Sequence, residues 1–351
     1  MKGLRIFFLF GVIILLGILL GCEETIVSHK PQDQRIVFYS NRTDSTEVFV
    51  MEQDGSNQER VTPSGLNIFP VGRAPLWSPD KEEIAFACLL NLPMPAIMLI
   101  NPDGTGLDTL VLHPGGNVLL GDWSPNENQI VYSAIPEFWM PPDPIEIFII
   151  NSDGTGNLKL DDGYQPRFCG NNKVVYTDYY GGGNIFIINT DGTGKKQLTD
   201  VGVGGGAYHM PVGSPDGRKI AFERSYSHLP SNPALGIMNS DSSGETLLVS
   251  GLAEGIAEIE FSPNGQRILF LTDNGDNSEI CVINIDGTGL DSLTGGIACG
   301  DGGASWSPDG EWIAFTSNRD GNKNIYRVST DGRKELVQLT DNPADDFNPD
   351  W

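Results

Sequence analysis

The amino-acid sequence predicts an all-β protein: a single seven-bladed β-propeller in which strands from the two ends of the chain share one blade. Three observations lead to this prediction. A short motif of the type Trp306-Ser307-Pro308-Asp309-Gly310 recurs in degraded form at intervals of 45 to 48 residues, and an apolar triplet closed by an aromatic residue recurs seven times. The 351 residues also include 43 Gly and 23 Pro, a composition typical of many short strands joined by turns.

The N-terminal residues predict export and a lipid anchor. Lys2 and Arg5 precede an apolar run over residues 6–20, shorter than the ~20 apolar residues that a membrane span needs. The run ends in Leu19-Leu20-Gly21-Cys22, which resembles the lipobox of bacterial lipoproteins, where a peptidase cuts before a cysteine whose thiol carries a diacylglycerol. The resemblance implies that Cys22 is lipidated. An ordinary signal peptide or a signal anchor with a chance cysteine is the alternative.

The expected organisation is therefore a signal peptide over residues 1–21, a linker over residues 22–30 and the propeller over residues 31–351. The formal net charge of −24 argues against nucleic acid and against electrostatic docking on anionic lipid. The lipid anchor is then the expected contact with a membrane. Glu23 is not the Asp linked to inner-membrane retention in enteric bacteria, so the outer membrane or its periplasmic side is favoured, with the cell surface as an alternative.

Each repeat is expected to begin with a short strand, strand A, whose last residue we call the aromatic position. A turn of the type Ser307-Pro308-Asp309-Gly310 follows, because Pro fixes φ and Gly tolerates positive φ. One repeat has Gly at the aromatic position. The seven positions are Trp77, Trp123, Phe168, Gly213, Phe261, Trp306 and Trp351.

Strand B is expected at the apolar triplet of each repeat. The triplets end at Phe38, Phe86, Tyr132, Tyr176, Phe222, Phe270 and Phe315.

Strand C is a second apolar run, such as Ile147-Phe148-Ile149, and an Asp-Gly turn leads from it into strand D, as hairpins prefer. Asp-Gly-Thr-Gly segments could suggest calcium loops, but no distal Glu recurs with them, so turn chemistry is the interpretation. A lone four-stranded sheet cannot bury both faces, whereas sheets stacked in a ring can.

Residues 306–340 resemble the repeat of the TolB-like, WD-repeat-like β-propeller family, including Trp306-Ser307-Pro308-Asp309-Gly310, Ile313-Ala314-Phe315 and Ile325-Tyr326. The resemblance extends over about residues 31–351 and implies the fold rather than one activity. TolB itself resembles a six-bladed ring with an N-terminal α/β domain. This chain has seven repeats and only a short linker after Cys22, so TolB's partners are not carried over.

The repeats also predict how the ring closes. The first triplet, at residues 36–38, has no strand A before it, and the last motif, Pro349-Asp350-Trp351, has no strand B after it. Residues 346–351 are therefore expected to complete the first blade beside residues 36–62.

The expected binding face carries the B–C and D–A connections, which we call the upper face. The A–B and C–D turns of the opposite, lower face are monotonous, whereas the upper connections are irregular and rich in aromatic residues, as binding loops on rigid scaffolds are. The alternative is that these loops only cover the ring. The candidate binding residues are Arg73, Phe138, Trp139, Met140, Tyr179, Tyr180, Tyr208, His209, Arg224, Tyr226 and His228.

Two classes of function fit these features. The first is a non-catalytic envelope scaffold that binds a protein or peptide, favoured by aromatic and Met-rich loops. The second is carbohydrate binding or cleavage, which a channel carboxyl with a strongly raised pKa would favour. No cofactor, catalytic motif or metal site is expected: Gly213-Ser214-Pro215-Asp216-Gly217 lacks the spacing of a serine-hydrolase elbow, and the four histidines form no ligand pattern.

Four cysteines follow Cys22 in the sequence, and none has a CxxC spacing. Export permits a disulfide, for which Cys281 with Cys299 is the least implausible pair. Ordinary buried thiols are the favoured interpretation. The four are Cys88, Cys169, Cys281 and Cys299.

Overall fold

A computed structural model describes residues 34–351, with gaps inside that range. The gaps are residues 44, 67, 69, 71–72, 91–93, 114–115, 127, 137–143, 179–181, 203–204, 226–232, 253–254, 274–277 and 296–302. Within the described ranges the regular structure is β-strand throughout. No helix in this part of the chain is long and apolar enough to cross a membrane.

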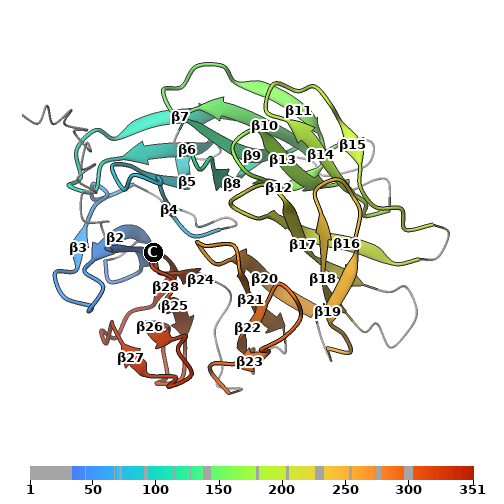
Figure 1. Cartoon of the computed structure of the whole chain (residues 1–351). Helices are drawn as coiled ribbons and strands as arrows, with labels where there is room; N and C mark the ends of the chain where they lie inside the picture. The colour runs from blue at the N-terminus through green and yellow to red at the C-terminus, as the bar shows by residue number, and fades with distance from the viewer. Residues whose placement is uncertain are drawn as a thin grey trace, which may run out of the picture. The chain divides into compact units, whose positions relative to one another are not determined.

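Seven four-stranded antiparallel sheets form the blades of the propeller (Figure 1). Blade 1 contains β28 (Asp346–Asp350), β1 (Ile36–Ser40), β2 (Glu47–Met51) and β3 (Glu59–Arg60). Blade 2 contains β4 (Leu76–Trp77), β5 (Ile84–Leu90), β6 (Met94–Ile100) and β7 (Asp108–Leu112). Blade 3 contains β8 (Gly116–Trp123), β9 (Gln129–Pro136), β10 (Glu146–Asn151) and β11 (Leu158–Asp162).

The other four blades follow in chain order. Blade 4 contains β12 (Tyr164–Phe168), β13 (Lys173–Thr177), β14 (Ile185–Asn189) and β15 (Lys196–Gln197). Blade 5 contains β16 (Ala207–Gly213), β17 (Lys219–Ser225), β18 (Ala234–Asn239) and β19 (Thr246–Val249). Blade 6 contains β20 (Gly255–Phe261), β21 (Arg267–Asp273), β22 (Ile280–Asn284) and β23 (Asp291–Ser292). Blade 7 contains β24 (Ala304–Trp306), β25 (Trp312–Ser317), β26 (Asn324–Ser329) and β27 (Leu336–Gln338).

The core lies between neighbouring blades, where the apolar strands B and C of each sheet are buried on both faces. Residues at the aromatic position pack against the preceding blade. Trp77 of blade 2 shares a buried cluster with Val37 and Val50 of blade 1, and Trp306 of blade 7 packs with Leu269 of blade 6. A buried Trp removes some 150–250 Å² from solvent, so these residues join successive sheets into a ring.

The turns of the lower face use side chains to satisfy the backbone. In the A–B turn of blade 7, Ser307 Oγ accepts a hydrogen bond from the Trp312 N–H (2.9 Å) and donates to Asp309 (2.6 Å). In the C–D turn of blade 3, Asp153 Oδ1 accepts hydrogen bonds from the N–H and hydroxyl of Thr155. Gly154, at φ 81°, occupies the left-handed conformation that this turn requires. The Asp-Gly-Thr-Gly segments are turns, as the sequence predicts.

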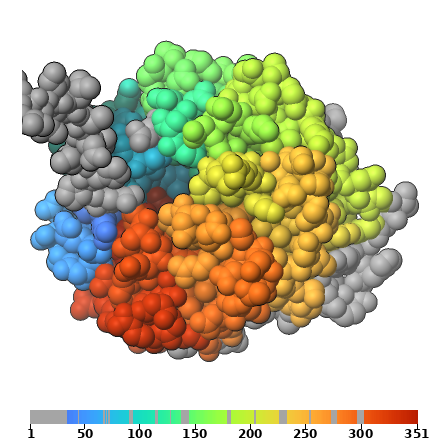
Figure 2. Space-filling view, in the orientation of Figure 1, coloured from blue at the N-terminus to red at the C-terminus, as the bar shows by residue number. Residues whose placement is uncertain are grey.

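The ring closes in blade 1, where the last strand of the chain pairs with the first. β28 runs antiparallel to β1, with Val37 opposite Asp350 and Ser40 opposite Asp346. The Trp351 side chain is buried, and its Nε1 donates to the Gln34 carbonyl (2.8 Å). Figure 2 shows the blue surface of the first blade beside the red surface of the last.

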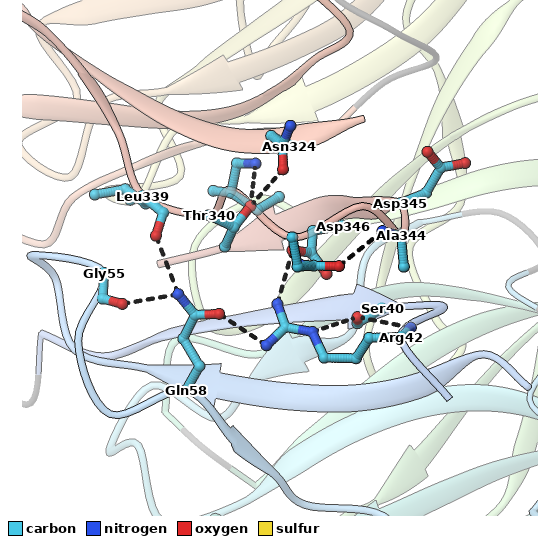
Figure 3. Close-up of polar contacts among 12 residues, drawn as sticks. Ser40, Arg42, Gly55, Gln58, Asn324, Leu339, Thr340, Ala344, Asp345 and Asp346 are labelled. Atoms are coloured by element: carbon cyan, nitrogen blue, oxygen red, sulfur yellow. Dashed lines mark hydrogen bonds and ion pairs between the residues drawn. The ribbon is translucent and has the colours of Figure 1, made fainter. Parts of the chain in front are cut away.

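A polar network around Arg42 reinforces this closure (Figure 3). The Arg42 guanidinium donates to the buried carboxylate of Asp346 (2.7 Å) and to Gln58 Oε1 (2.8 Å). Gln58 in turn donates to the carbonyl of Leu339 in blade 7 (3.1 Å). One guanidinium therefore links β28 to the N-terminal strands, and through Gln58 it links blade 1 to blade 7.

The predicted seven-bladed, all-β architecture and its shared blade are confirmed. Burial raises the pKa of the Cys88 thiol to about 11 and that of Cys169 to about 12, as expected of unreactive core thiols. Cys281 is also buried, whereas Cys299 lies outside the described residues, as do the predicted signal peptide and Cys22.

Candidate functional site

The innermost strand of each blade is an edge strand that faces the centre of the ring. Its outward N–H groups have no further strand to bind, which suits Pro at this edge. Pro75, Pro166, Pro211 and Pro349 each lie two residues before the aromatic position. The sequence therefore removes, in four blades, a backbone donor from this edge.

Backbone bulges shape these inner strands. β12, β16 and β28 each contain a register shift, and the residue three before the aromatic position has a positive φ in each of them. These residues are Gln165 at 56°, Met210 at 49° and Asn348 at 52°. Left-handed backbone at a non-glycine residue costs on the order of 1–3 kcal/mol and clusters at functional sites. Among the described residues, three of the seven non-glycine residues with positive φ therefore lie where the strands line the channel.

A cavity of about 330 Å³ lies at the centre of the ring and is lined by residues from all seven blades. This volume is at the small end of the ~300–1,000 Å³ that ligand pockets occupy. Its polar lining includes Arg73, Tyr164, Gln165, Arg167, Glu258 and Asn348. Its apolar lining includes Leu119, Leu120, Ile145, Met210, Val212 and Ile259.

Side chains of one blade satisfy backbone donors of the next. Glu258 Oε2 accepts hydrogen bonds from the Gly303 N–H (3.1 Å) and the Ala304 N–H (3.0 Å). Gln165 Oε1 accepts one from the Met210 N–H (3.0 Å). Each bond gives a partner to a backbone N–H group at a strand edge in the channel wall. It also holds in place a polar side chain that lines the cavity.

Two guanidiniums converge in the channel. Arg73 Nη1 and Arg167 Nη1 both donate to the Gly121 carbonyl, at 3.3 and 3.2 Å. Arg73 also forms an ion pair with Glu258 (3.5 Å), and both side chains are largely buried. The shared carbonyl holds the two guanidiniums side by side. Among the described residues, Arg73 has an ion-pair partner and Arg167 has none.

Three inner strands carry a carboxyl side chain one residue before the aromatic position, within two residues of a residue that lines the cavity. Asp122 accepts hydrogen bonds from the N–H groups of Phe168 (3.0 Å) and Trp123 (3.0 Å), and Asp350 accepts one from the Trp77 N–H (2.8 Å). Glu260 is the third, and its Oε2 is buried without a hydrogen-bond partner in the described part of the chain.

The surroundings raise the pKa of two of these carboxyls. Burial raises the pKa of Asp122 to about 6, although the nearby Arg73 partly opposes the shift. Burial, with smaller contributions from Asp350 and Glu258, raises the pKa of Glu260 well above its usual value despite the opposing Arg73. The channel therefore contains two carboxyl groups that keep a proton to a higher pH than an exposed carboxyl does.

These shifts predict how stability depends on pH. The pKa of Asp122 rises from 3.8 to about 6 on folding, so between these values the folded state holds a proton that the unfolded chain has lost. The stabilisation that the Asp122 proton contributes is fully present below pH 3.8 and is lost as the pH rises through about 6. His209 acts in the opposite direction, because burial lowers its pKa. Melting temperatures of wild type and Asp122→Asn, measured from about pH 4.5 to 7.5, separate the two contributions.

The wild-type protein should lose more stability than Asp122→Asn as the pH rises over this interval. The Asn side chain keeps an oxygen that can accept a backbone hydrogen bond but does not titrate. Parallel curves for the two proteins would contradict an Asp122 carboxyl with a raised pKa.

The structure places four of the predicted binding residues. Arg73 lines the cavity. His209 Nδ1 lies 2.9 Å from the Tyr164 hydroxyl, and Tyr164 lines the same cavity. Tyr208 and Arg224 do not line the cavity. The described residues thus bring Arg73 and His209 to the channel.

Tyr208 and His209 are part of strand β16 rather than of the D–A connection in which the sequence prediction placed them. Tyr208 is only 3% exposed and packs edge-on against Phe222, with ring centroids 5.3 Å apart. Arg224 lies over the Tyr208 ring and forms an ion pair with Glu245 (2.9 Å). These contacts give Tyr208 a packing role. The other candidates, Phe138, Trp139, Met140, Tyr179, Tyr180, Tyr226 and His228, lie outside the described residues.

Sequence reasoning missed most of the channel. Arg167, Glu258 and Glu260 belong to inner strands that were treated only as structural parts of the repeat. A usable signal exists: charged residues directly precede the aromatic position at Asp122, Arg167, Glu260 and Asp350. A strand residue that is charged where other repeats have Leu76, Val212 or Ser305 stands out once the repeats are aligned.

The fold and the cavity define a class: a seven-bladed β-propeller with a ligand-sized pocket in its central channel. Residues 254–351 match the family model described as the TolB beta propeller domain, which confirms the predicted TolB-like repeat over that part of the chain. No curated protein matches this chain. Within the described residues, no group of three or more His, Cys, Asp or Glu side chains is arranged to hold a metal ion.

Solved structures with the same fold have low sequence identity to this chain. TolB from Acinetobacter baumannii is 17% identical, with 91% of this chain and 67% of that chain covered and a TM-score of 0.58. An oligogalacturonate lyase from Vibrio parahaemolyticus is 12% identical, with 86% and 88% covered and a TM-score of 0.67. An oligogalacturonate lyase in complex with manganese is 13% identical, with 88% and 87% covered and a TM-score of 0.68. Identities this low describe the fold and leave the activity open.

Proposed function

We propose that this protein is a lipid-anchored scaffold of the cell envelope that binds a protein or peptide through its upper face and central cavity. The cavity supports the proposal most directly, because five inner strands and the segments just before the other two contribute to it, and its walls combine apolar side chains with fixed charges. Interfaces derive most of their binding energy from a few groups inserted into such pockets. The proposed role is non-catalytic.

The proposed anchor is the lipid carried by Cys22, which would hold the acidic propeller at the outer membrane. Replacement of this residue, Cys22→Ser, removes the thiol that would be acylated. We expect the variant to lose lipidation and normal cleavage. Metabolic labelling with a fatty acid and fractionation of cells test this expectation. If the Cys22→Ser protein still sediments with membranes after its signal peptide has been removed, the lipid-anchor hypothesis is wrong.

Carbohydrate binding or cleavage is the second candidate, and one observation favours it. Glu260 follows the cavity-lining Ile259, has a raised pKa and has a carboxyl oxygen without a partner among the described residues, as a residue that exchanges protons with a substrate can have. The protein-binding role remains our first proposal because the cavity is small and much of its lining is apolar.

Affinity capture from solubilised envelope membranes tests the first proposal, with the intact lipoprotein as bait. A glycan array probed with the same preparation tests the second. We expect a discrete protein partner and no glycan above background. A glycan signal that Glu260→Gln removes, without a captured protein, would favour carbohydrate over a protein partner.

A further inference from the structure

The two guanidiniums in the channel form a ready-made site for a carboxylate. Arg73 and Arg167 donate to one carbonyl, that of Gly121, at 3.3 and 3.2 Å, so their cationic groups are held close together. Glu258 pairs with Arg73 at 3.5 Å but also accepts two backbone hydrogen bonds through its other oxygen. Arg167 thus adds a positive charge to the wall, with the planar donor geometry that matches a carboxylate.

An apolar surface lies in the same cavity as this pair. Met210, Val212 and Ile259 come from blades 5 and 6, and Leu119 and Leu120 come from blade 3. These side chains would lose no hydrogen bonds on contact with an aliphatic or aromatic group. A ligand that fits both parts of the wall must carry an apolar group and a carboxylate a few ångströms apart.

The size of the cavity restricts how a polypeptide could enter it. A loop must pass through the mouth twice, and about 330 Å³ is too small for two chain passages with their side chains. A chain end passes once. An Asp or Glu side chain supplies a carboxylate without an adjacent apolar group, whereas an apolar C-terminal residue supplies both on a single Cα.

We propose that the central cavity binds the free C-terminal residue of a partner polypeptide, with its carboxylate at Arg73 and Arg167 and an apolar side chain against the partly buried Met210 and Val212. This proposal rests on the protein-binding function proposed above and specifies its ligand. Asp122, Glu260 and Asp350 follow the cavity-lining residues along their strands, so the carboxylate is expected to stop at the arginines rather than move further along the channel.

Peptide pools provide the test. Fluorescein-labelled random hexapeptides ending in Leu with a free carboxylate are compared with the same pool ending in Leu carboxamide and with a pool ending in Asp carboxamide. Binding to the intact lipoprotein in detergent is followed by fluorescence anisotropy. We expect the free-carboxylate Leu pool to bind at least about tenfold more tightly than either amidated pool, as charge-assisted hydrogen bonds allow. This comparison needs no variant.

Arg167→Gln should reduce the tenfold preference to nearly none. Arg218→Gln is the matched control, because Arg218 is an exposed arginine in the lower-face turn of blade 5. Equal binding of free and amidated pools, no binding of any pool, or a preference that survives Arg167→Gln in a folded protein would overturn the proposal. Tighter binding of a short oligogalacturonate than of every peptide pool would also overturn it. If the peptide test fails but a protein is captured from membranes, the protein-binding function is retained and only the C-terminal residue as its ligand is excluded.

Discussion

Deletion of residues 346–351 is expected to open the ring and to unfold blade 1. The truncation removes β28, the buried Trp351 and the Asp346 carboxylate that binds Arg42. Loss of a buried Trp side chain alone costs about 3–5 kcal/mol, and the exposed edge of β1 adds to that cost. Thermal unfolding should show a large fall in melting temperature, or no cooperative transition.

A graded control distinguishes ring closure from the loss of one contact. Trp351→Phe keeps the strand and an aromatic ring but loses the hydrogen bond from Nε1 to the Gln34 carbonyl, a change worth about 1 kcal/mol. The truncation should therefore be far more destabilising than the point variant. An unchanged melting temperature in the truncated protein would refute closure by this strand.

Trp123→Ala is expected to produce the largest loss of stability among the single substitutions considered. Trp123 is 5% exposed and packs in a buried cluster with Ala85 and Ile97 of blade 2 and Ile130 of its own blade. Its removal leaves a cavity between two sheets, at a cost of about 3–5 kcal/mol. Chemical denaturation should reveal this loss as a lower midpoint.

Trp139→Ala is the paired variant. The sequence places Trp139 between β9 and β10, in an upper-face insertion outside the described residues. We expect a cost within about 1 kcal/mol for folding but at least ~2 kcal/mol for binding a captured partner, because Trp is enriched at interface hot spots. Equal destabilisation by the two variants would mean that this insertion is a packed cover of the ring.

The fold could be predicted from the sequence because every blade is built from the same local features. The Ile-Ala-Phe type of strand B, the Ser-Pro-Asp-Gly turn and the aromatic position each leave a local signal. The closure could be predicted from a mismatch, since one end of the chain lacked a strand A and the other lacked a strand B. The unmatched strand B that ends at Phe38 and the unmatched strand A that ends at Trp351 are both evident from the sequence alone.

The channel could not be predicted in the same way because it is built across repeats. Gly121, Arg167 and Glu258 lie in three different blades, and their proximity depends on ring radius and on the bulges of the inner strands. The left-handed backbone at Met210 and Gln165 breaks the alternation of a regular strand, so counting from the aromatic position does not show which side chain enters the cavity. The sequence prediction relied on aromatic residues in the loops, whereas Arg167 and Glu258, which line the cavity, lie in the inner strands.

Blocking the channel tests the central claim most directly. Ala257 is exposed and lines the cavity, so Ala257→Trp should fill it with little change in folding. The matched control is Leu290→Trp, since Leu290 is 54% exposed beside the C–D turn of blade 6 on the lower face. With equal melting temperatures, wild type and Leu290→Trp should capture the same membrane partner, and Ala257→Trp should lose it. Capture by Ala257→Trp at the wild-type level would contradict binding through the central cavity.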